Sequence, residues 1–349
     1  MSEKTATQQL EGPLLSVEDL KINIQIDNKT LNAVDGVDFN LEKGKTLGLV
    51  GESGCGKSLT SRAIMNLNPK ECETTGEVLY SSSIDRKMRN LNILSLNPSG
   101  RKMRSIRGEK ISMIFQEPMT ALSPLYTIGN QIMEMILLHR TKNKHEAKQI
   151  ALDMLRKVGI SDEENRFDQY PHEFSGGMRQ RVVIAMALSC NPELLIADEP
   201  TTALDVTIQA QVLELMKELQ DEFEMAILLV THDLGVVAEV CDEVAVMYLG
   251  KIVEKASVKE IFNNPKHPYT KGLINSMPRL GKNKQHLTPI EGTVPLAVNM
   301  QNQCGFYDRC KHRMPGICDA SAVPNFEVSD EHRVRCFLYD EDKEEVKNV

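Results

Sequence analysis

The sequence has no uninterrupted apolar run that approaches the roughly 18 residues a membrane-spanning helix requires. Its N-terminus, Met-Ser-Glu-Lys-Thr-Ala-Thr-Gln-Gln, is polar and lacks the apolar core of a signal peptide. The formal net charge is −8, which argues against a nucleic-acid footprint over the whole surface. These absences favour a chain on the cytoplasmic side that binds no nucleic acid. We expect it to serve a membrane only through membrane partners.

The chain has room for a proper core, and its most informative stretch lies at residues 51–58. The 349 residues suffice for about two domains, and 41% of them are hydrophobic. Residues 51–58 fit the phosphate-binding pattern G-x-x-x-x-G-K-[ST]. Residues 46–50 before it predict a strand, and residues 59–67 after it predict a helix. These flanks disfavour the alternative, a glycine-rich turn that binds nothing.

Such a loop wraps the phosphates of a nucleotide in backbone N–H groups at a helix start. Side chains in place of the glycines would block this close approach. We expect Lys57 to reach the β- and γ-phosphates and Ser58 to hold Mg²⁺. The predicted nucleotide contacts are Gly51, Glu52, Ser53, Gly54, Cys55, Gly56, Lys57 and Ser58.

Two carboxylates follow a second apolar segment, 194–197, which predicts another strand. Asp198 is placed to hold Mg²⁺ through water, and Glu199 is placed to polarise the attacking water. Alone this signal is weak, because strands often end in solvated acidic residues. The phosphate-binding loop upstream is what favours the functional interpretation.

A Ser-Gly-Gly sequence, Ser175, Gly176 and Gly177, opens a predicted helix that runs to about Cys190. Pro192 disfavours its continuation. A helix start of this kind is a second anion site, although a lone Ser-Gly-Gly is often an ordinary N-cap. Two phosphate-binding helix starts suggest one nucleotide held between two subunits.

Two more polar residues follow predicted strands. His232 comes directly after the apolar segment 226–230, and Gln116 comes after 111–115. Side chains at the carboxyl ends of such strands point into the crevice where α/β folds bind ligands. His232 is placed to contact a γ-phosphate, and Gln116 to sense Mg²⁺ and the attacking water.

In this order the elements resemble those of ATP-binding cassette (ABC) ATPases over about residues 14–265. The resemblance implies an α/β fold, a P-loop core with antiparallel β and helical subdomains, the latter at about 119–190. It implies a head-to-tail dimer that holds two ATP molecules between the loop of one subunit and the Ser-Gly-Gly signature of the other. The roles it implies are catalysis by Glu199, His232, Lys57 and Gln116, Mg²⁺ binding by Ser58, Gln116 and Asp198, and a D-loop at Thr202, Ala203, Leu204 and Asp205.

Two positions depart from the common cassette pattern. Met178 replaces a frequent glutamine of the signature, as in the peptide-importer branch. The family usually stacks an aromatic residue on adenine some thirty residues before the loop lysine, but residues 20–27 contain none. Ile24 or Ile26 can offer only apolar packing there, without π-stacking.

The segments 264–273 and 290–295 resemble the C-terminal part of oligopeptide, dipeptide and nickel importers. The chain thus resembles the "D"-type ATP-binding subunit of a peptide importer, with a cassette at 1–265 and an extension at 266–349. The resemblance implies a peripheral protein on the cytoplasmic face of the membrane. Its implied partners are a paralogous ATPase subunit, two transmembrane permeases and an extracytoplasmic substrate-binding protein. The implied cargo is di- or oligopeptides, or alternatively nickel or another small solute.

The extension carries four clustered cysteines with the spacing C-x₅-C-x₇-C-x₁₇-C: Cys304, Cys310, Cys318 and Cys336. Disulfides are disfavoured in a reducing compartment, and zinc sites usually show closer C-x₂₋₄-C pairs. The resemblance implies a [4Fe-4S] cluster, while zinc and plain thiols stay open. His312 and His332 are candidates for groups just outside the ligands. A metal cross-link suits an extension with little apolar material for its own core.

The sequence disfavours three other functions. A chromosome or repair ATPase would carry long coiled-coil heptads between the phosphate loop and the signature, and there are none. A soluble translation factor of this type would carry two cassettes. A binding module without catalysis would lack Glu199 or His232, and this chain has both.

Overall fold

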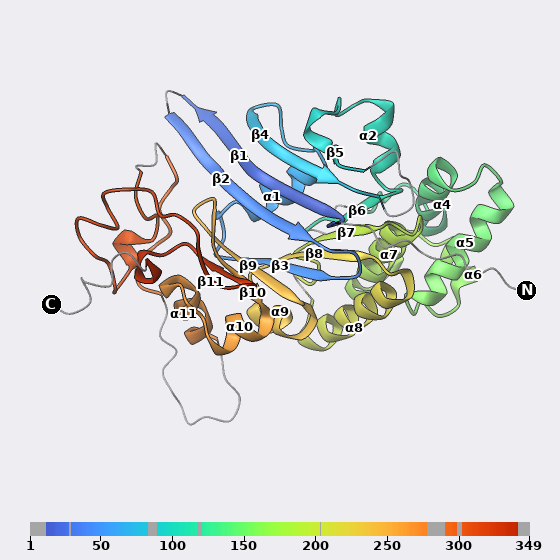
Figure 1. The fold of residues 1–349 in the computed structure, drawn as a ribbon. Helices are drawn as coiled ribbons and strands as arrows, with labels where there is room; N and C mark the ends of the chain where they lie inside the picture. Colours follow the sequence, from blue (N-terminus) through green and yellow to red (C-terminus); the bar gives the residue numbers. More distant parts are fainter. Residues whose placement is uncertain are drawn as a thin grey trace, which may run out of the picture.

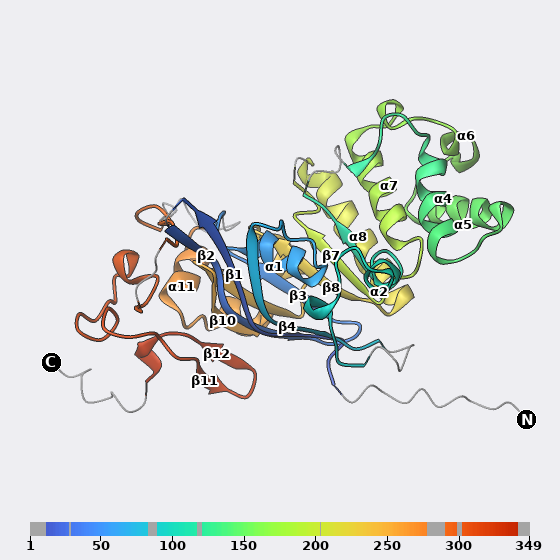
Figure 2. The same ribbon diagram turned by 90° about the horizontal axis from the view of Figure 1, so that it is seen from above.

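A computed structural model describes residues 12–27, 29–82, 89–116, 121–202, 204–277, 290–298 and 302–340. Ala203 of the predicted D-loop and the polar first nine residues lie outside these ranges. No helix within them is long and apolar enough to cross a membrane. Two sheets and the tail form one part of the molecule, and a helical lobe lies at one end (Figures 1 and 2).

An eight-stranded sheet is the centre of the fold, with strand order β11-β12-β10-β9-β3-β8-β7-β6. Its parallel strands are β3 (Thr46–Val50), β6 (Ile111–Ile114), β7 (Leu194–Asp198), β8 (Ala226–Thr231) and β9 (Glu243–Tyr248). Strands β3, β7 and β8 are buried along their whole length, as expected of strands covered on both faces. Because these strands are parallel, their carboxyl ends meet at one edge of the sheet, where the polar residues predicted above follow them.

A second sheet is antiparallel and has the order β2-β1-β4-β5. Its strands are β1 (Leu15–Ile26), β2 (Lys29–Leu41), β4 (Cys72–Tyr80) and β5 (Leu91–Asn92). Helix α1 (Lys57–Ile64) contacts strands of both sheets. Apolar side chains of both sheets and of α1 share one core cluster. The short elements η2 (Ile93–Ser95) and α2 (Arg101–Ile106) follow β5 in the chain.

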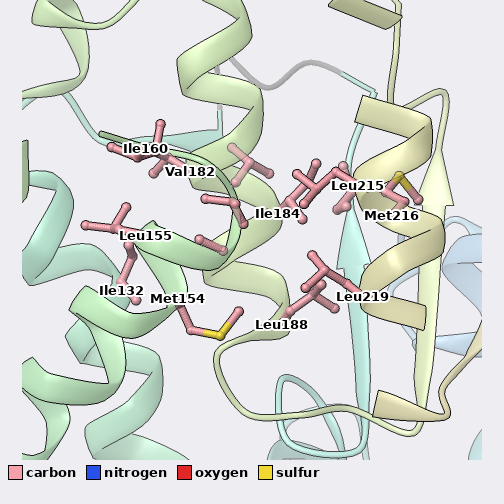
Figure 3. Close-up of a cluster of buried hydrophobic side chains, with 14 of the residues drawn as sticks. Ile132, Met154, Leu155, Ile160, Val182, Ile184, Leu188, Leu215, Met216 and Leu219 are labelled. Atoms are coloured by element: carbon pink, nitrogen blue, oxygen red, sulfur yellow. The ribbon is translucent and has the colours of Figure 1, made fainter. Parts of the chain in front are cut away.

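The helical lobe is built around α7 (Gly176–Leu188). Helices α4 (Ile128–His139), α5 (Lys144–Lys157) and α6 (Glu163–Phe167) pack together in this lobe, and η3 (Pro171–Glu173) comes just before α7 in the chain. Helix α8 (Val206–Phe223) lies on the other side of α7. In Figure 3 apolar side chains from α4, α5, α7 and α8 meet in one cluster, among them Ile132, Leu155, Ile184, Leu188 and Leu219.

The chain from residue 234 onward closes the fold. Here lie α9 (Leu234–Val240), β10 (Lys251–Ser257), α10 (Val258–Asn263), α11 (Pro268–Asn275), η4 (Tyr307–Arg309), β11 (Phe326–Ser329), β12 (His332–Val334) and η5 (Phe337–Tyr339). Strand β12 pairs with β10, so the tail extends the main sheet. Tyr269, Ala297 and Phe306 join one apolar cluster with Val246 and Tyr248 of β9. The extension thus packs its apolar side chains into a core that it shares with the cassette.

Candidate ATP site and four-cysteine site

The phosphate loop joins the end of β3 to the start of α1. Gly51 and Gly56 have left-handed φ values of 156° and 105°. A Cβ atom at Gly51 would lie 2.2 Å from the carbonyl oxygen of Met247, and one at Gly56 would lie 2.4 Å from that of Ala33. Only glycine fits at both positions. Backbone N–H groups at the start of α1 therefore form the kind of cradle that binds phosphate.

The Lys57 side chain bonds to the backbone of its own loop. Its Nζ donates to the carbonyl oxygens of Gly51 at 2.8 Å and Glu52 at 3.2 Å, and the residue is buried. Cys55 is fully buried beside it, and desolvation raises the pKa of its thiol. A buried, protonated thiol is consistent with a spacer rather than an oxidation-sensitive group.

Ser58 and Asp198 meet at the mouth of the loop. The Ser58 hydroxyl donates to Asp198 Oδ1 at 3.2 Å. Asp198 ends β7 and is 3% exposed, and burial raises the pKa of its carboxyl group. A hydroxyl and a carboxylate oxygen are ligands that Mg²⁺ accepts beside nucleotide phosphates.

Glu199 lies at the centre of a polar ring. Its φ of 50° is left-handed, and its N–H donates to the Val230 carbonyl oxygen of β8 at 2.8 Å. Its carboxylate accepts from Gln116 Nε2 at 3.1 Å and from Thr202 Oγ1 at 3.0 Å, and it lies 3.2 Å from His232 Nδ1. The backbone and three side chains thus fix the direction of this carboxylate.

The structure brings most of the predicted site residues together, but not all. Lys57, Ser58, Asp198 and Glu199 gather at one edge of the main sheet with Gln116 and His232. The resemblance places Thr202 only in the D-loop, but its hydroxyl also bonds to Glu199. Its spacing of three residues from Glu199 is the only signal that could have pointed to it.

The signature residues lie apart from this cluster. Ser175 is the N-cap of α7, and its hydroxyl accepts the Met178 N–H at 3.3 Å. Helix α7 belongs to the lobe of α4 and α5, away from α1 (Figure 2). Within one chain, therefore, Ser175, Gly176 and Gly177 do not face the phosphate loop.

The four cysteines of the tail line one small cavity. Its lining includes Cys304, Cys310, Cys318 and Cys336, together with His267, His312 and Phe306. All four are free thiols. Burial, with a further contribution from neighbouring cysteines, raises the pKa of Cys304 to about 11 and that of Cys336 to about 12.

The described residues of this cavity are not arranged as a metal-ion site. In the described part of the chain, no group of three or more His, Cys, Asp or Glu side chains is arranged to hold a metal ion. His312 lines the cavity. His332, expected beside the ligands, instead places Nε2 2.8 Å from Oε1 of the fully buried Glu254. That expectation is wrong, because this pair joins β12 to β10.

Two family models match separate stretches of the chain. Residues 34–202 match the family model "ABC transporter", and residues 253–318 match "Oligopeptide/dipeptide transporter, C-terminal region". The dipeptide transport ATP-binding protein DppD of Bacillus subtilis (strain 168) is 51% identical, over 94% of this chain and 95% of that protein. The oligopeptide transport ATP-binding protein AppD of the same organism is 49% identical, over 94% and 98%.

Solved structures give the same class. A dimeric cassette, MJ0796, bound to ADP and Pi superimposes with a TM-score of 0.60 at 26% identity, over 70% of this chain and 98% of that one. CbiO1 of Clostridium perfringens, part of the transporter complex cbiONQ, gives 0.60 at 27% identity, over 73% and 92%. The fold and the loop with its paired carboxylates define an ATP-binding cassette. The chain belongs to the ABC transporter family, among the ATP-binding proteins of oligopeptide and dipeptide transporters.

Proposed function

We propose that this chain hydrolyses ATP to power the import of di- or oligopeptides through a membrane ABC transporter. The observation that carries the proposal is the ring of Gln116, Thr202 and His232 around Glu199, one residue from the Asp198–Ser58 pair. The names of the relatives, which specify dipeptide and oligopeptide transport, favour peptides over nickel or another solute.

The residues of the chain divide the chemistry between them. Lys57 and the backbone N–H groups from Gly51 to Ser58 hold the β- and γ-phosphates and stabilise charge on the transferring phosphoryl group. Ser58 and Asp198, with Gln116, would hold Mg²⁺, which neutralises charge on the phosphate oxygens. Glu199 orients the attacking water and accepts its proton. His232 keeps the Glu199 carboxylate in position and faces the γ-phosphate.

A complete site requires a second cassette. Since Ser175, Gly176 and Gly177 begin a helix in the other lobe, they are free to act on the nucleotide of a neighbouring subunit. The dimeric form of the similar cassette MJ0796 supports this arrangement. We propose a head-to-tail dimer with a paralogous ATPase subunit. The N–H groups at the start of α7 in one subunit would contact the γ-phosphate bound by the other subunit, from the side opposite to Lys57.

Contact with the permeases is proposed for the exposed face of the helical lobe. Leu125, Tyr126 and Leu138 are 79%, 60% and 59% exposed. Tyr126 and Leu138 line an open cavity of about 600 Å³ on α4. Because Met133 and Leu137 line the same cavity, these apolar side chains are contiguous, and a contiguous exposed apolar patch marks an interaction surface. We place two transmembrane permeases there, with the chain peripheral on the cytoplasmic face and a substrate-binding protein on the opposite side.

A [4Fe-4S] cluster is our proposal for the four cysteines. The fit rests on four free thiols around one cavity, Cys304, Cys310, Cys318 and Cys336. Four cysteine thiolates are the usual ligand set of a [4Fe-4S] cluster. It would supply a cross-link between the segments that carry Cys304 and Cys336. Its binding would release protons from thiols such as those of Cys304 and Cys336, whose pKa is raised.

Reconstitution tests the function directly. The chain is assembled with its permeases, partner ATPase and binding protein in vesicles, and uptake of labelled di- and oligopeptides is measured with ATP inside. We expect ATP-dependent uptake that Glu199→Gln abolishes. Uptake of nickel without uptake of any peptide would contradict the proposal.

A further inference from the structure

Arg309 reaches from the cysteine-bearing segment to the phosphate loop. It ends η4, which lies between Cys304 and Cys310. Its guanidinium forms a two-pronged ion pair with Glu52, with Nη1 2.7 Å from Oε2 and Nη2 3.1 Å from Oε1. Glu52 is the second residue of the phosphate loop and lies 257 residues away in the sequence. The tail therefore makes a direct charged contact with the ATP site.

The guanidinium has an acceptor for each of its five N–H donors. Besides the two bonds to Glu52, it donates to the carbonyl oxygens of Glu291 at 3.0 Å and Gly292 at 3.3 Å, and to the Tyr248 hydroxyl at 3.4 Å. The side chain is only 5% exposed. The Glu52 carboxylate above all, and the Tyr248 hydroxyl, raise the pKa of Arg309 further above its ordinary value. A guanidinium paired in this way is held in one orientation.

Aromatic rings support the same group. The Arg309 guanidinium carbon lies 5.7 Å from the ring centre of Tyr248 and 5.8 Å from that of Phe306. The Tyr269 ring packs against both, at 4.6 Å from Tyr248 and 5.5 Å from Phe306. The ion pair therefore lies on a rigid aromatic base that the cassette and the tail build together.

The backbone of Glu52 is fixed as well as its side chain. Its N–H donates to the hydroxyl of the fully buried Tyr269 of α11 at 2.9 Å. Its carbonyl oxygen accepts from Lys57 Nζ at 3.2 Å. A single residue thus connects two residues of the extension, Arg309 and Tyr269, with the lysine that reaches the phosphates.

We propose that Arg309 is a positioning residue of the ATP site, which acts through Glu52 to hold the phosphate loop in the conformation that binds nucleotide. A phosphate loop binds well because its N–H groups are oriented in advance. Without Arg309, the Glu52 carboxylate loses its counter-ion and the first half of the loop loses its fixed direction. The tail thereby sets nucleotide affinity. The inference depends on ATP binding and not on which metal the cysteines hold.

A purely structural brace is the competing explanation, in which Arg309 only attaches the tail to the cassette. The two differ in what Glu52 does. A brace predicts a lower Tm with unchanged nucleotide affinity. A positioning role predicts weaker affinity that depends on the Glu52 carboxylate.

The test uses the full-length chain in the assembled transporter with Arg309→Met, Arg309→Lys, Glu52→Gln and the double variant Arg309→Met/Glu52→Gln. Lys311→Ala is the matched control, since Lys311 belongs to the same segment but its 66% exposed side chain pairs with Glu291. The Kd of a non-hydrolysable Mg-ATP analogue is measured by calorimetry, with KM, kcat and Tm beside it.

We expect Arg309→Met to raise Kd and KM about tenfold, equivalent to about 1.4 kcal/mol, with a smaller change in kcat. The Kd and KM of Arg309→Lys should lie between those of the wild type and those of Arg309→Met, because an ammonium cannot pair with both carboxylate oxygens in the same two-pronged way. In a chain that already carries Glu52→Gln, adding Arg309→Met should change Kd by less than half as much as it does in the wild type. The control Lys311→Ala should leave Kd unchanged. Unchanged Kd and KM in Arg309→Met, or an effect fully additive with Glu52→Gln, would overturn the proposal. Should Arg309→Met fail to fold, Arg309→Lys and Glu52→Gln carry the same comparison.

Discussion

Oδ1 of Asp198 lies 3.2 Å from Oγ of Ser58, although 140 residues separate them in the sequence. The strand β7 and the start of α1 bring them together at the carboxyl edge of the main sheet. Asp198 is almost fully buried, and this burial raises the pKa of its carboxyl group. An ionised carboxylate in such a place costs free energy until a cation joins it. The pair is therefore built to gain from bound Mg²⁺.

Asp198→Asn should stabilise the protein in the absence of nucleotide and abolish Mg²⁺-dependent ATP binding. Because the carboxyl pKa is raised in the folded state, the folded chain holds a proton that the unfolded chain has already released. The wild-type protein therefore loses stability as pH rises from about 3.9, the ordinary Asp value, through the raised pKa. Asp198→Asn should not lose stability over this pH range, because its amide does not ionise. Thermal unfolding against pH, with and without Mg-ATP, measures both effects.

Asp153→Asn is the control for that experiment. Asp153 lies on α5 with its side chain 54% exposed, so its removal should change neither the Tm profile nor ATP binding. A lower Tm for Asp198→Asn at neutral pH without nucleotide would contradict the desolvation argument.

We expect His267 to make the tail sensitive to acid. It is buried, and its Nδ1 caps α11 by accepting the Tyr269 N–H at 3.0 Å. Burial lowers the pKa of His267 to about 3. Between that value and about 6.5, the ordinary His pKa, only the unfolded chain binds the proton. The free energy of unfolding should therefore fall as pH drops through this window, by up to about 1.4 kcal/mol per pH unit.

His267→Asn keeps a capping acceptor without the titration. Urea unfolding at several pH values between about 4 and 7 should give a shallower slope for this variant than for the wild type. Identical slopes would show that another group carries the acid sensitivity.

The cysteine site should be visible in the purified protein. Prepared without oxygen, the wild-type chain should be brown with broad visible absorbance, and serine at Cys304, Cys310, Cys318 or Cys336 should remove the colour. Because Arg309 lies between Cys304 and Cys310, these variants should also weaken ATP binding.

Cys72→Ser is the matched control, since Cys72 lies in β4 outside the cysteine cavity. Colourless wild-type protein with stoichiometric zinc would reject iron and keep the four ligands. Protein with neither metal would reject the site itself.

The local parts of the ATP site could be predicted from the sequence. The apolar segments before Gly51, Asp198 and His232 are strands β3, β7 and β8, and the parallel sheet gathers the residues that follow them. The helix after the loop begins at Lys57 and ends at Ile64, slightly earlier than expected. Glycine pattern and apolar runs encode such local structure directly.

Contacts between distant side chains could not be predicted in this way. Nothing near Glu52 indicates that its counter-ion is Arg309, and nothing near His332 indicates Glu254. A charged residue in a loop usually faces solvent, so the sequence favours that interpretation. Only the pairing of β12 with β10 and the packing of Phe306 into the cassette bring these residues together.

The account as a whole depends most on Glu199 as the group that accepts the proton of the attacking water. Glu199→Gln retains the size of the side chain and removes its basicity. Steady-state phosphate release is measured in the assembled transporter, with Glu222→Gln, an exposed carboxylate paired with Lys157, as the control. We predict at least about a hundredfold loss of phosphate release, with ATP still bound and the cassette dimer held closed. Phosphate release near the wild-type rate would contradict the central claim.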